Sequence, residues 1–167
     1  LSCCPLSLTI PFSLTHTVSS PSDYKIGVIE NLGATLDQFD VIDFTDNDIQ
    51  KLGGFPRLLR LKTLLLSNNR VTRIAPGLET SIAGLEEINF TNNKLADLVH
   101  LKPLSTLPNL TRLSLIQNPV ARLKHYRAFV IRTLPNVKVL DFHKVKDAER
   151  IAAAELFSGD VGAALYA

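Results

Sequence analysis

Apolar residues in the central part of the chain recur at uneven gaps that fit neither a helix nor an ordinary strand. From Leu36 they recur after three, three and two positions, and Asn47 follows three positions after the last of them. A helix would repeat every 3.6 residues and a half-buried strand every second residue. With Φ for an apolar residue, the pattern Φ-x-x-Φ-x-Φ-x-x-N-x-Φ occurs four times. Its copies begin, at intervals of 22, 24 and 25 residues, at Phe39, Leu61, Leu85 and Leu110.

A repeat of this length and order is typical of a leucine-rich repeat array, and the sequence therefore predicts an α/β solenoid. The central x-Φ-x-Φ-x of each copy predicts a short strand whose apolar side chains point inward. Stacked strands form a parallel sheet on the concave side, with a helical or irregular convex side. A fifth copy, Val137-Leu140-Phe142, keeps the strand but has Val145 in place of the asparagine.

The repeated asparagine is predicted to be structural. The turn after each strand buries backbone groups that the neighbouring strands cannot satisfy. An asparagine side chain can bond such groups, because its amide both donates and accepts. The four repeat asparagines are Asn47, Asn69, Asn93 and Asn118.

The repeat boundaries divide the chain into a leader, a leucine-rich repeat domain and a tail. The domain spans 23–160, with repeats near 24–38, 39–60, 61–84, 85–109 and 110–136. A C-terminal cap spans 122–157, and the tail is 161–167. Residues 122–134 predict an amphipathic helix with Tyr126, Phe129, Val130 and Leu134 on one face, and the Ala- and Glu-rich residues 145–157 predict a closing helix.

The first 22 residues, LSCCPLSLTIPFSLTHTVSSPS, have no formally charged side chain. They do not fit a secretory signal, because no basic segment precedes the apolar run and two prolines interrupt it. We expect 1–22 to be a leader outside the repeat domain, either disordered or a translated intron end. The strand of a first repeat would fall near Ser19 and Pro21, where apolar residues are missing, and we expect it to be absent.

Side chains that alternate with the buried ones should face solvent on the concave sheet, where a partner would bind. Leu65 and Ile116 are apolar at positions where a solvated sheet usually has polar residues. Together with Asp43, Glu87 and nearby polar groups they suit a helix with an apolar stripe and basic flanks. The partner-binding candidates are Val41, Asp43, Thr45, Thr63, Leu65, Ser67, Glu87, Asn89, Thr91, Arg112, Ser114, Ile116, Asp141 and His143.

Charge is unevenly distributed along the chain, although the formal net charge is only +2. Residues 23–99 carry 11 acidic and 8 basic side chains, whereas 110–150 carry 9 basic and 3 acidic ones. Either the basic flank is simply solvated or the two ends serve different partners. The candidates for phosphate contacts are Lys25 near the N-terminal end and Lys144, Lys146 and Arg150 on the cap; the alternative for the cap is a solvated helix with charge pairs among Lys146, Asp147, Glu149 and Arg150.

The sequence offers no catalytic site. The four histidines lie far apart, the adjacent Cys3 and Cys4 have no metal-ligand spacing, and neither a phosphate-binding loop nor a nucleophile elbow occurs. His143 and Asp141, two residues apart, are the nearest approach to an acid–base pair. We therefore expect no enzymatic activity, no cofactor, no metal and no small-molecule substrate, and an apolar content of 46% in short segments predicts no membrane span.

Several stretches resemble one family of leucine-rich repeat proteins more closely than the repeat pattern requires. They include VIENLGATLDQFDVIDFTDNDI, RLKTLLLSNNR and LPNVKVLDFHKVK, and the resemblance covers residues 24 to about 160. They are similar to the A-prime proteins of the U2 small nuclear ribonucleoprotein. Relative to that family, the first strand is replaced by the leader and a long charged C-terminal tail is lacking.

The resemblance implies a nuclear role in pre-mRNA splicing. Members of the family hold the RNA-recognition-motif domain of a sister protein, B-double-prime, on the concave sheet, and the pair binds a stem-loop of U2 small nuclear RNA. The repeat alone leaves a second possibility, a regulatory subunit that binds a phosphatase or a cytoskeletal protein. That alternative would not need the basic cap.

Overall fold

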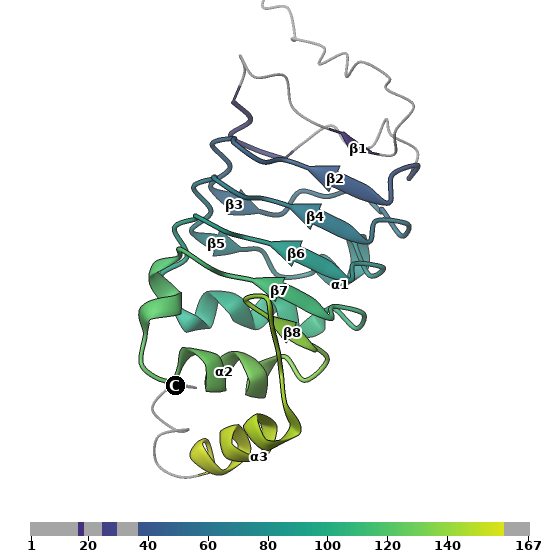
Figure 1. Cartoon of the computed structure of the whole chain (residues 1–167). Helices are drawn as coiled ribbons and strands as arrows, with labels where there is room; N and C mark the ends of the chain where they lie inside the picture. The colour runs from purple at the N-terminus through teal and green to yellow at the C-terminus, as the bar shows by residue number, and fades with distance from the viewer. Residues whose placement is uncertain (1–16, 19–24, 30–36, 159–167) are drawn as a thin grey trace, which may run out of the picture.

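The backbone of the protein, described here by a computed structural model of residues 17–18, 25–29 and 37–158, is organised around one sheet of short strands (Figure 1). The strands follow the spatial order β1-β2-β4-β6-β7-β8-β9, and all are parallel until the last pair. Their bounds are Thr17–Val18 (β1), Val41–Asp43 (β2), Thr63–Leu65 (β4), Glu87–Asn89 (β6), Arg112–Ser114 (β7), Val139–Leu140 (β8) and His143–Lys144 (β9).

The register of this sheet is set by the repeated apolar pattern. Ile42 is paired with Leu64, Leu64 with Ile88, and each of these side chains is buried. A shift of the pairing by one residue would move a whole row of buried apolar side chains to the solvent face of the sheet. Burial of one face therefore fixes the register of the strands. The predicted leucine-rich repeat solenoid with a parallel sheet is confirmed.

The opposite layer changes from extended to helical along the chain. It begins with two short parallel strands, β3 (Lys51–Leu52) and β5 (Arg73–Ile74). It continues with the short helix α1 (Leu78–Ser81), the 3₁₀ helix η2 (Leu98–Thr106) and the 3₁₀ turn η3 (Pro119–Arg122). The convex side is therefore partly extended and partly helical, whereas the sequence predicted a helical or irregular one.

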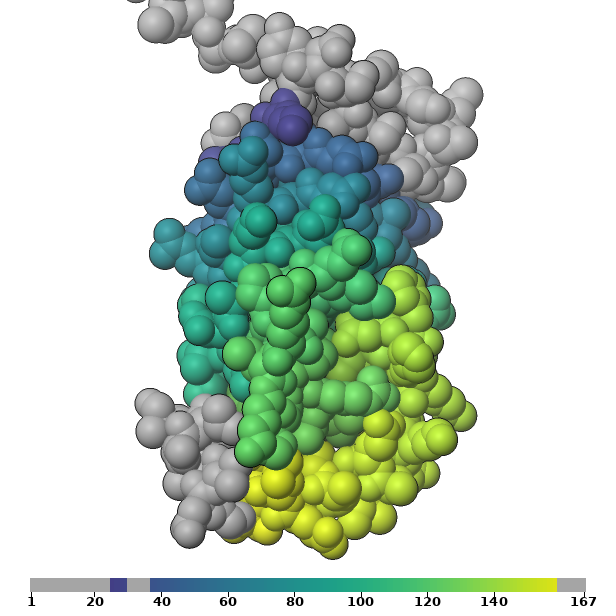
Figure 2. Space-filling view, turned by 60° about the vertical axis from the view of Figure 1, so that its left-hand side comes forward, coloured from purple at the N-terminus to yellow at the C-terminus, as the bar shows by residue number. Residues whose placement is uncertain are grey.

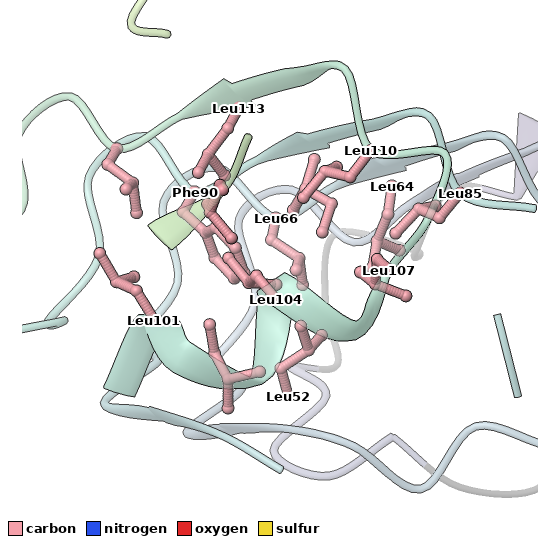
Figure 3. Close-up of a cluster of buried hydrophobic side chains, with 14 of the residues drawn as sticks. Leu52, Leu64, Leu66, Leu85, Phe90, Leu101, Leu104, Leu107, Leu110 and Leu113 are labelled. Carbon is pink, nitrogen blue, oxygen red and sulfur yellow. The ribbon is translucent and has the colours of Figure 1, made fainter. Parts of the chain in front are cut away.

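The core lies between these two layers and is almost entirely aliphatic. Leu64, Leu66 and Leu85 come from the sheet side, and Leu101 and Leu104 of η2 approach them from the opposite side (Figure 3). All five are no more than 1% exposed. Since each repeat buries its apolar side against its neighbours, the stack is stabilised mainly by contacts between repeats.

Two helices close the C-terminal end. They are α2 (Tyr126–Thr133) and α3 (Asp147–Leu156), and the space-filling view shows α3 as the last layer of the stack (Figure 2). The Phe129 ring meets the Phe157 ring edge to face, with centroids 6.1 Å apart. The predicted helix over 122–134 is shorter than expected: it begins at Tyr126, because His125 has a left-handed backbone with φ of 62°.

Strand β1 contradicts the expectation that no strand precedes β2. Thr17 pairs with Val41 in a parallel register, so a strand lies inside the segment predicted as leader, two residues before the expected position near Ser19. Apolar side chains were the signal used to place strands, and this pairing is made by the backbone. The rest of the predicted leader, the residues 23–24 and 30–36 of the first repeat, and the tail 161–167 lie outside the described residues.

Candidate functional site

The four repeat asparagines are buried in the turns that follow the strands. Asn69 shows the arrangement: its Oδ1 accepts the Ile49 N–H at 3.0 Å, while its Nδ2 donates to the carbonyls of Phe44 and Leu66 at 2.8 and 3.1 Å. Asn93 and Asn118 repeat the same contacts one and two repeats further on. These side chains join neighbouring repeats and are therefore not available to a ligand.

The residue before each of these asparagines has a left-handed backbone, which the repeat pattern did not predict. The φ angles are 62° at Asp46, 58° at Asn68, 55° at Asn92 and 59° at Gln117. Asn68 Nδ2 donates to Asp46 Oδ1 at 2.7 Å, and Asn92 Nδ2 donates to Asn68 Oδ1 at 2.9 Å. Asparagine and aspartate tolerate this conformation better than other non-glycine residues. The aspartate or asparagine before three of the repeat asparagines was therefore the sequence feature that could have indicated a left-handed backbone there.

The candidate binding surface is the solvent side of the sheet, which we call the sheet face. It is formed by the side chains that alternate with the buried ones. The register sets two rows across it: Val41, Thr63, Glu87, Arg112 and Val139 in one, and Asp43, Leu65, Asn89 and Ser114 in the other, of which Ser114 is buried. Beyond the strand ends, a third row consists of Thr45, Ser67, Thr91 and Ile116.

Asp43 and Leu65 lie side by side on the sheet face, because the register pairs them directly. Asp43 Oδ1 accepts the backbone N–H of Thr45 at 2.8 Å, and among the described residues its carboxylate has no ion pair. Both side chains are half-buried. An acid and an apolar side chain are therefore presented together at the N-terminal half of this surface.

Glu87 is placed differently from Asp43, although both were predicted to contact a partner. Its carboxylate lies 3.1 Å from Nη1 of Arg112 on the next strand. The polar contacts continue at the neighbouring positions, where Asn89 Oδ1 accepts the Thr91 hydroxyl at 2.6 Å, and the Thr91 and Ser114 hydroxyls are 3.2 Å apart. In this part of the sheet face, the polar side chains bind one another.

Asp141 does not face solvent on the sheet as predicted. Strand β8 ends at Leu140, and the Asp141 carboxylate accepts the Leu115 N–H at 2.7 Å and the Tyr126 hydroxyl at 2.9 Å. In the preceding repeats the equivalent N–H groups, such as that of Phe90, bond a backbone carbonyl of the next strand. Asp141 therefore ends the sheet. Burial and the adjacent carboxylate raise the pKa of Tyr126, which keeps its hydroxyl protonated as the donor.

His143 and Phe142 also differ from their predicted places. The chain turns back after β8, so His143 lies on the antiparallel strand β9, and its Nδ1 is 2.8 Å from the backbone oxygen of Asp141 rather than from the carboxylate. The two do not form an acid–base pair. Phe142, assigned by the fifth repeat to the core, is 69% exposed and has a φ of 62°.

The predicted phosphate contacts divide into two kinds. Lys144 and Lys146 are exposed at the cap and make no ion pair within the described ranges, and Lys25 lies at the other end of the stack, 3.9 Å from Asp48. Arg150, in contrast, donates from Nη1 to the Pro135 oxygen at 2.9 Å and from Nη2 to the Val137 oxygen at 2.6 Å. Its guanidinium fastens α3 to the last repeat, and a phosphate contact by Arg150 stays a prediction.

The cap has a central ion pair that the sequence did not indicate. Arg127 of α2 donates from Nε to Glu149 of α3 at 2.7 Å, and Glu149 Oε2 also accepts the backbone N–H of Lys146 at 2.9 Å. The hydrogen bond from Arg127 is the main reason that the pKa of Glu149 is lowered to about 2. Glu149 is therefore paired with a side chain of α2 rather than with a neighbour on its own helix.

Over residues 17–18, 25–29 and 37–158, no three histidine, cysteine, aspartate or glutamate side chains are grouped so that they could hold a metal ion. No helix in those ranges has the length and apolar character needed to cross a bilayer. The fold defines a leucine-rich repeat protein that has a polar sheet face, acidic and apolar at one end, and a basic cap.

Comparisons with known proteins agree with this class. The leucine-rich repeat family matches residues 13–167. The chain is 58% identical over 142 residues to the human U2 small nuclear ribonucleoprotein A′, and 52% identical over 134 residues to the protein of that name from Arabidopsis thaliana. These alignments cover 85% and 80% of this chain, and 56% and 54% of those relatives.

A solved structure gives the more complete match. It is the crystal structure of the Drosophila melanogaster SNF/U2A′ complex, one chain of which superposes with a TM-score of 0.82 at 48% identity, covering 86% of this chain and 82% of that one. The chain therefore belongs to the U2 small nuclear ribonucleoprotein A′ family. It spans about half the length of the curated relatives.

Proposed function

We propose that the protein is a non-catalytic scaffold of the U2 small nuclear ribonucleoprotein that acts in the nucleus, in pre-mRNA splicing. Its sheet face holds the RNA-recognition-motif domain of a protein of the SNF or B-double-prime type. The pair then binds the U2 small nuclear RNA stem-loop. The similar Drosophila chain was solved in a complex with SNF, which supports a partner of that kind.

The observation that carries the protein–protein half of the proposal is the pairing of Asp43 and Leu65. A helix laid across the sheet face would place an apolar side chain against Leu65 and a basic one against the unpaired carboxylate of Asp43. Glu87 contributes less, since Arg112 already neutralises it. Interfaces of this kind depend on a few central anchors surrounded by weaker polar contacts.

The RNA half of the proposal rests on the cap. Lys144 and Lys146 are exposed, unpaired within the described residues, and separated by one residue. Lysines arranged in this way contact phosphates without reading bases, so the sister protein supplies most of the sequence specificity. The present chain alone is expected to bind RNA weakly.

The experiment is a calorimetric titration of the chain into the partner's RNA-recognition domain, with and without the stem-loop. The Asp43→Lys variant should weaken binding to the domain at least tenfold, because it faces basic side chains with a like charge. The Asp97→Lys variant is the matched control, since Asp97 is an exposed acid before η2, on the opposite layer. It should bind as the unchanged chain does.

Two outcomes would contradict the proposal. One is that the folded chain does not bind the domain at any accessible concentration. The other is that Asp43→Lys and Asp97→Lys have equal effects, which would move the contact away from the sheet face. The RNA half is tested separately with Lys146→Glu, which should weaken binding only when the stem-loop is present.

A further inference from the structure

Phe142 occupies a position at which the backbone favours glycine. It forms, with Asp141, the two-residue turn between β8 and β9, and both residues have positive φ angles, 62° and 53°. Turns of this kind strongly prefer asparagine and glycine, and a left-handed backbone costs a side chain with a Cβ about 1–2 kcal/mol. Burial does not offset this cost, since the Phe142 side chain is 69% exposed. The strain is compatible with a functional reason for the ring.

The turn that carries Phe142 is held from several directions. The Asp141 carboxylate bonds both Leu115 and Tyr126, as described above. Arg127 Nη1 donates to the Leu140 oxygen at 3.3 Å, on the strand that enters the turn. Below the turn, the N–H of Val145 donates to the Lys138 oxygen at 2.8 Å. A ring displayed on so constrained a hairpin loses little conformational entropy when it binds.

Three basic side chains belong to this hairpin: Lys144 lies two residues after Phe142, and Lys138 and Lys146 lie at its base. Lys144 pairs with Val139 across the hairpin, which directs it to the solvent side of the sheet, and Lys146 follows it. Lys138 on the other arm is exposed too, and within the described residues none of the three lysines has an ion pair. The only acid in the turn, Asp141, is already occupied by its two donors.

An exposed aromatic ring two residues from an unpaired cation matches the way proteins hold single-stranded nucleic acid. The ring offers a face on which any base can stack, while the cations hold the adjacent phosphates. A protein helix would fit less well, because it would have to bring an acidic side chain to Lys144 and an apolar side chain to the ring at once. The charge balance therefore favours RNA.

We propose that Phe142 stacks on an unpaired base of the RNA and that Lys144 contacts the phosphate next to that base. This inference rests on the RNA-binding half of the proposed function and makes it more specific. The contact is selective for an unstacked base over a paired one, and it does not read the identity of the base. It gives the chain a direct part in RNA recognition, beyond phosphate contacts to a stem.

The test uses the full chain, the partner's RNA-recognition domain and stem-loop RNAs that each carry one 2-aminopurine at an unpaired position. Stacking on Phe142 should quench the fluorescence of one of these probes. Phe142→Ala should remove that quenching and weaken assembly with RNA roughly 5- to 100-fold. Phe142→Trp keeps an aromatic face and should retain both the quenching and the affinity.

Three other outcomes of this experiment bear on the stacking of Phe142 on the RNA. Unchanged quenching and affinity for Phe142→Ala would overturn it. An equal loss of affinity for the partner domain in the absence of RNA would also overturn it, because Phe142 would then be a protein anchor. If the chain does not bind the domain at all, the proposed function fails. The inference is then decided by titrating the chain with the labelled loop alone at low salt, where an unchanged Phe142→Ala curve overturns it.

Discussion

At the scale of single residues, the asparagine of each repeat and the residue before it have different structural roles in the turn. Asn69 bonds groups of the previous repeat and of its own, while Asn68 takes up the left-handed backbone and extends a chain of side-chain bonds along the surface. The first is buried and the second is exposed. Their substitutions should therefore differ in cost.

Replacing Asn69 with alanine should lower the free energy of unfolding by about 1–3 kcal/mol, because the Ile49 N–H and the Phe44 carbonyl would lose their partner while buried. Urea unfolding followed by circular dichroism measures the change. Gln50→Ala is the control, since Gln50 is exposed in the same turn region. Equal stability of the two variants would show that the asparagine is not needed by the turn.

Replacing Phe142 with glycine should raise the free energy of unfolding by about 1 kcal/mol, because it relieves a left-handed backbone at an exposed position. Phe142→Ala retains a Cβ at the same φ and should gain much less. Thermal unfolding of the two variants is the measurement. A clear loss of stability in Phe142→Gly would mean that the ring packs against the protein and is not displayed.

At the scale of elements, the repeat spacing determined the strands but not the cap. Strands β2, β4, β6 and β7 lie where the pattern placed them, since burial of alternate residues leaves one possible register. The fifth copy, Val137-Leu140-Phe142, has the same apolar pattern and yet turns back after Leu140. Nothing in its composition signals two successive positive φ angles without glycine.

The ends of the cap helices depended on contacts that link distant parts of the chain. Helix α2 starts late because His125 adopts a left-handed backbone. Helix α3 is held in place by the ion pair between Arg127 and Glu149. It is also held by the hydrogen bond from Arg150 to the Pro135 carbonyl, 15 residues away. Long-range bonds of this type leave no local pattern, so sequence periodicity could identify the helices but not the side chains that hold them.

Substitution of Glu149 with glutamine should destabilise the cap by roughly 1 kcal/mol at neutral pH, because a half-buried ion pair to Arg127 is lost. The pKa of Glu149 is about 2 when folded, below its usual value of 4.5. The carboxylate therefore stabilises the folded state fully above pH 4.5, and this stabilisation is lost as the pH falls toward 2. Unfolding measured across this range should show the two proteins converging in acid.

A control for the pH effect is Glu155→Gln, since Glu155 is an exposed acid on the same helix. Its effect on unfolding should be small throughout the range. If Glu149→Gln and the unchanged protein differ by the same amount at pH 7 and pH 2, the difference does not come from the charge of Glu149.

At the scale of the whole molecule, the acidic and basic charges are distributed toward opposite ends of the stack. Asp43 lies near the start of the sheet, and the unpaired lysines lie on and beside the last hairpin. In the proposed function, the partner domain and the RNA would therefore not compete for the same side chains. The affinity of the sheet face for the partner domain should depend only modestly on salt concentration. The affinity of the cap for RNA should depend on it strongly.

Replacing both Lys144 and Lys146 with glutamine should lower the salt dependence of assembly with RNA. Each phosphate contact contributes about one unit to the slope of log affinity against log salt concentration, so the slope should fall by roughly two. Titrations between 50 and 200 mM salt give this slope, and Lys51→Gln, on the opposite layer, is the control. An unchanged slope would remove these lysines from the RNA contact.

The bond from Asp141 to the Leu115 N–H has a consequence for how copies of the protein meet one another. A parallel sheet normally ends in a row of backbone donors and acceptors that can recruit a further strand, and exposed edges of this kind promote aggregation. Here the Asp141 side chain binds one of these donors, the Leu115 N–H. After β8 the chain reverses direction into the antiparallel strand β9 and does not continue the parallel sheet. The same carboxylate that completes the fold thus closes this donor to an added strand, and the outer edge passes to β9, whose two residues offer few groups for pairing.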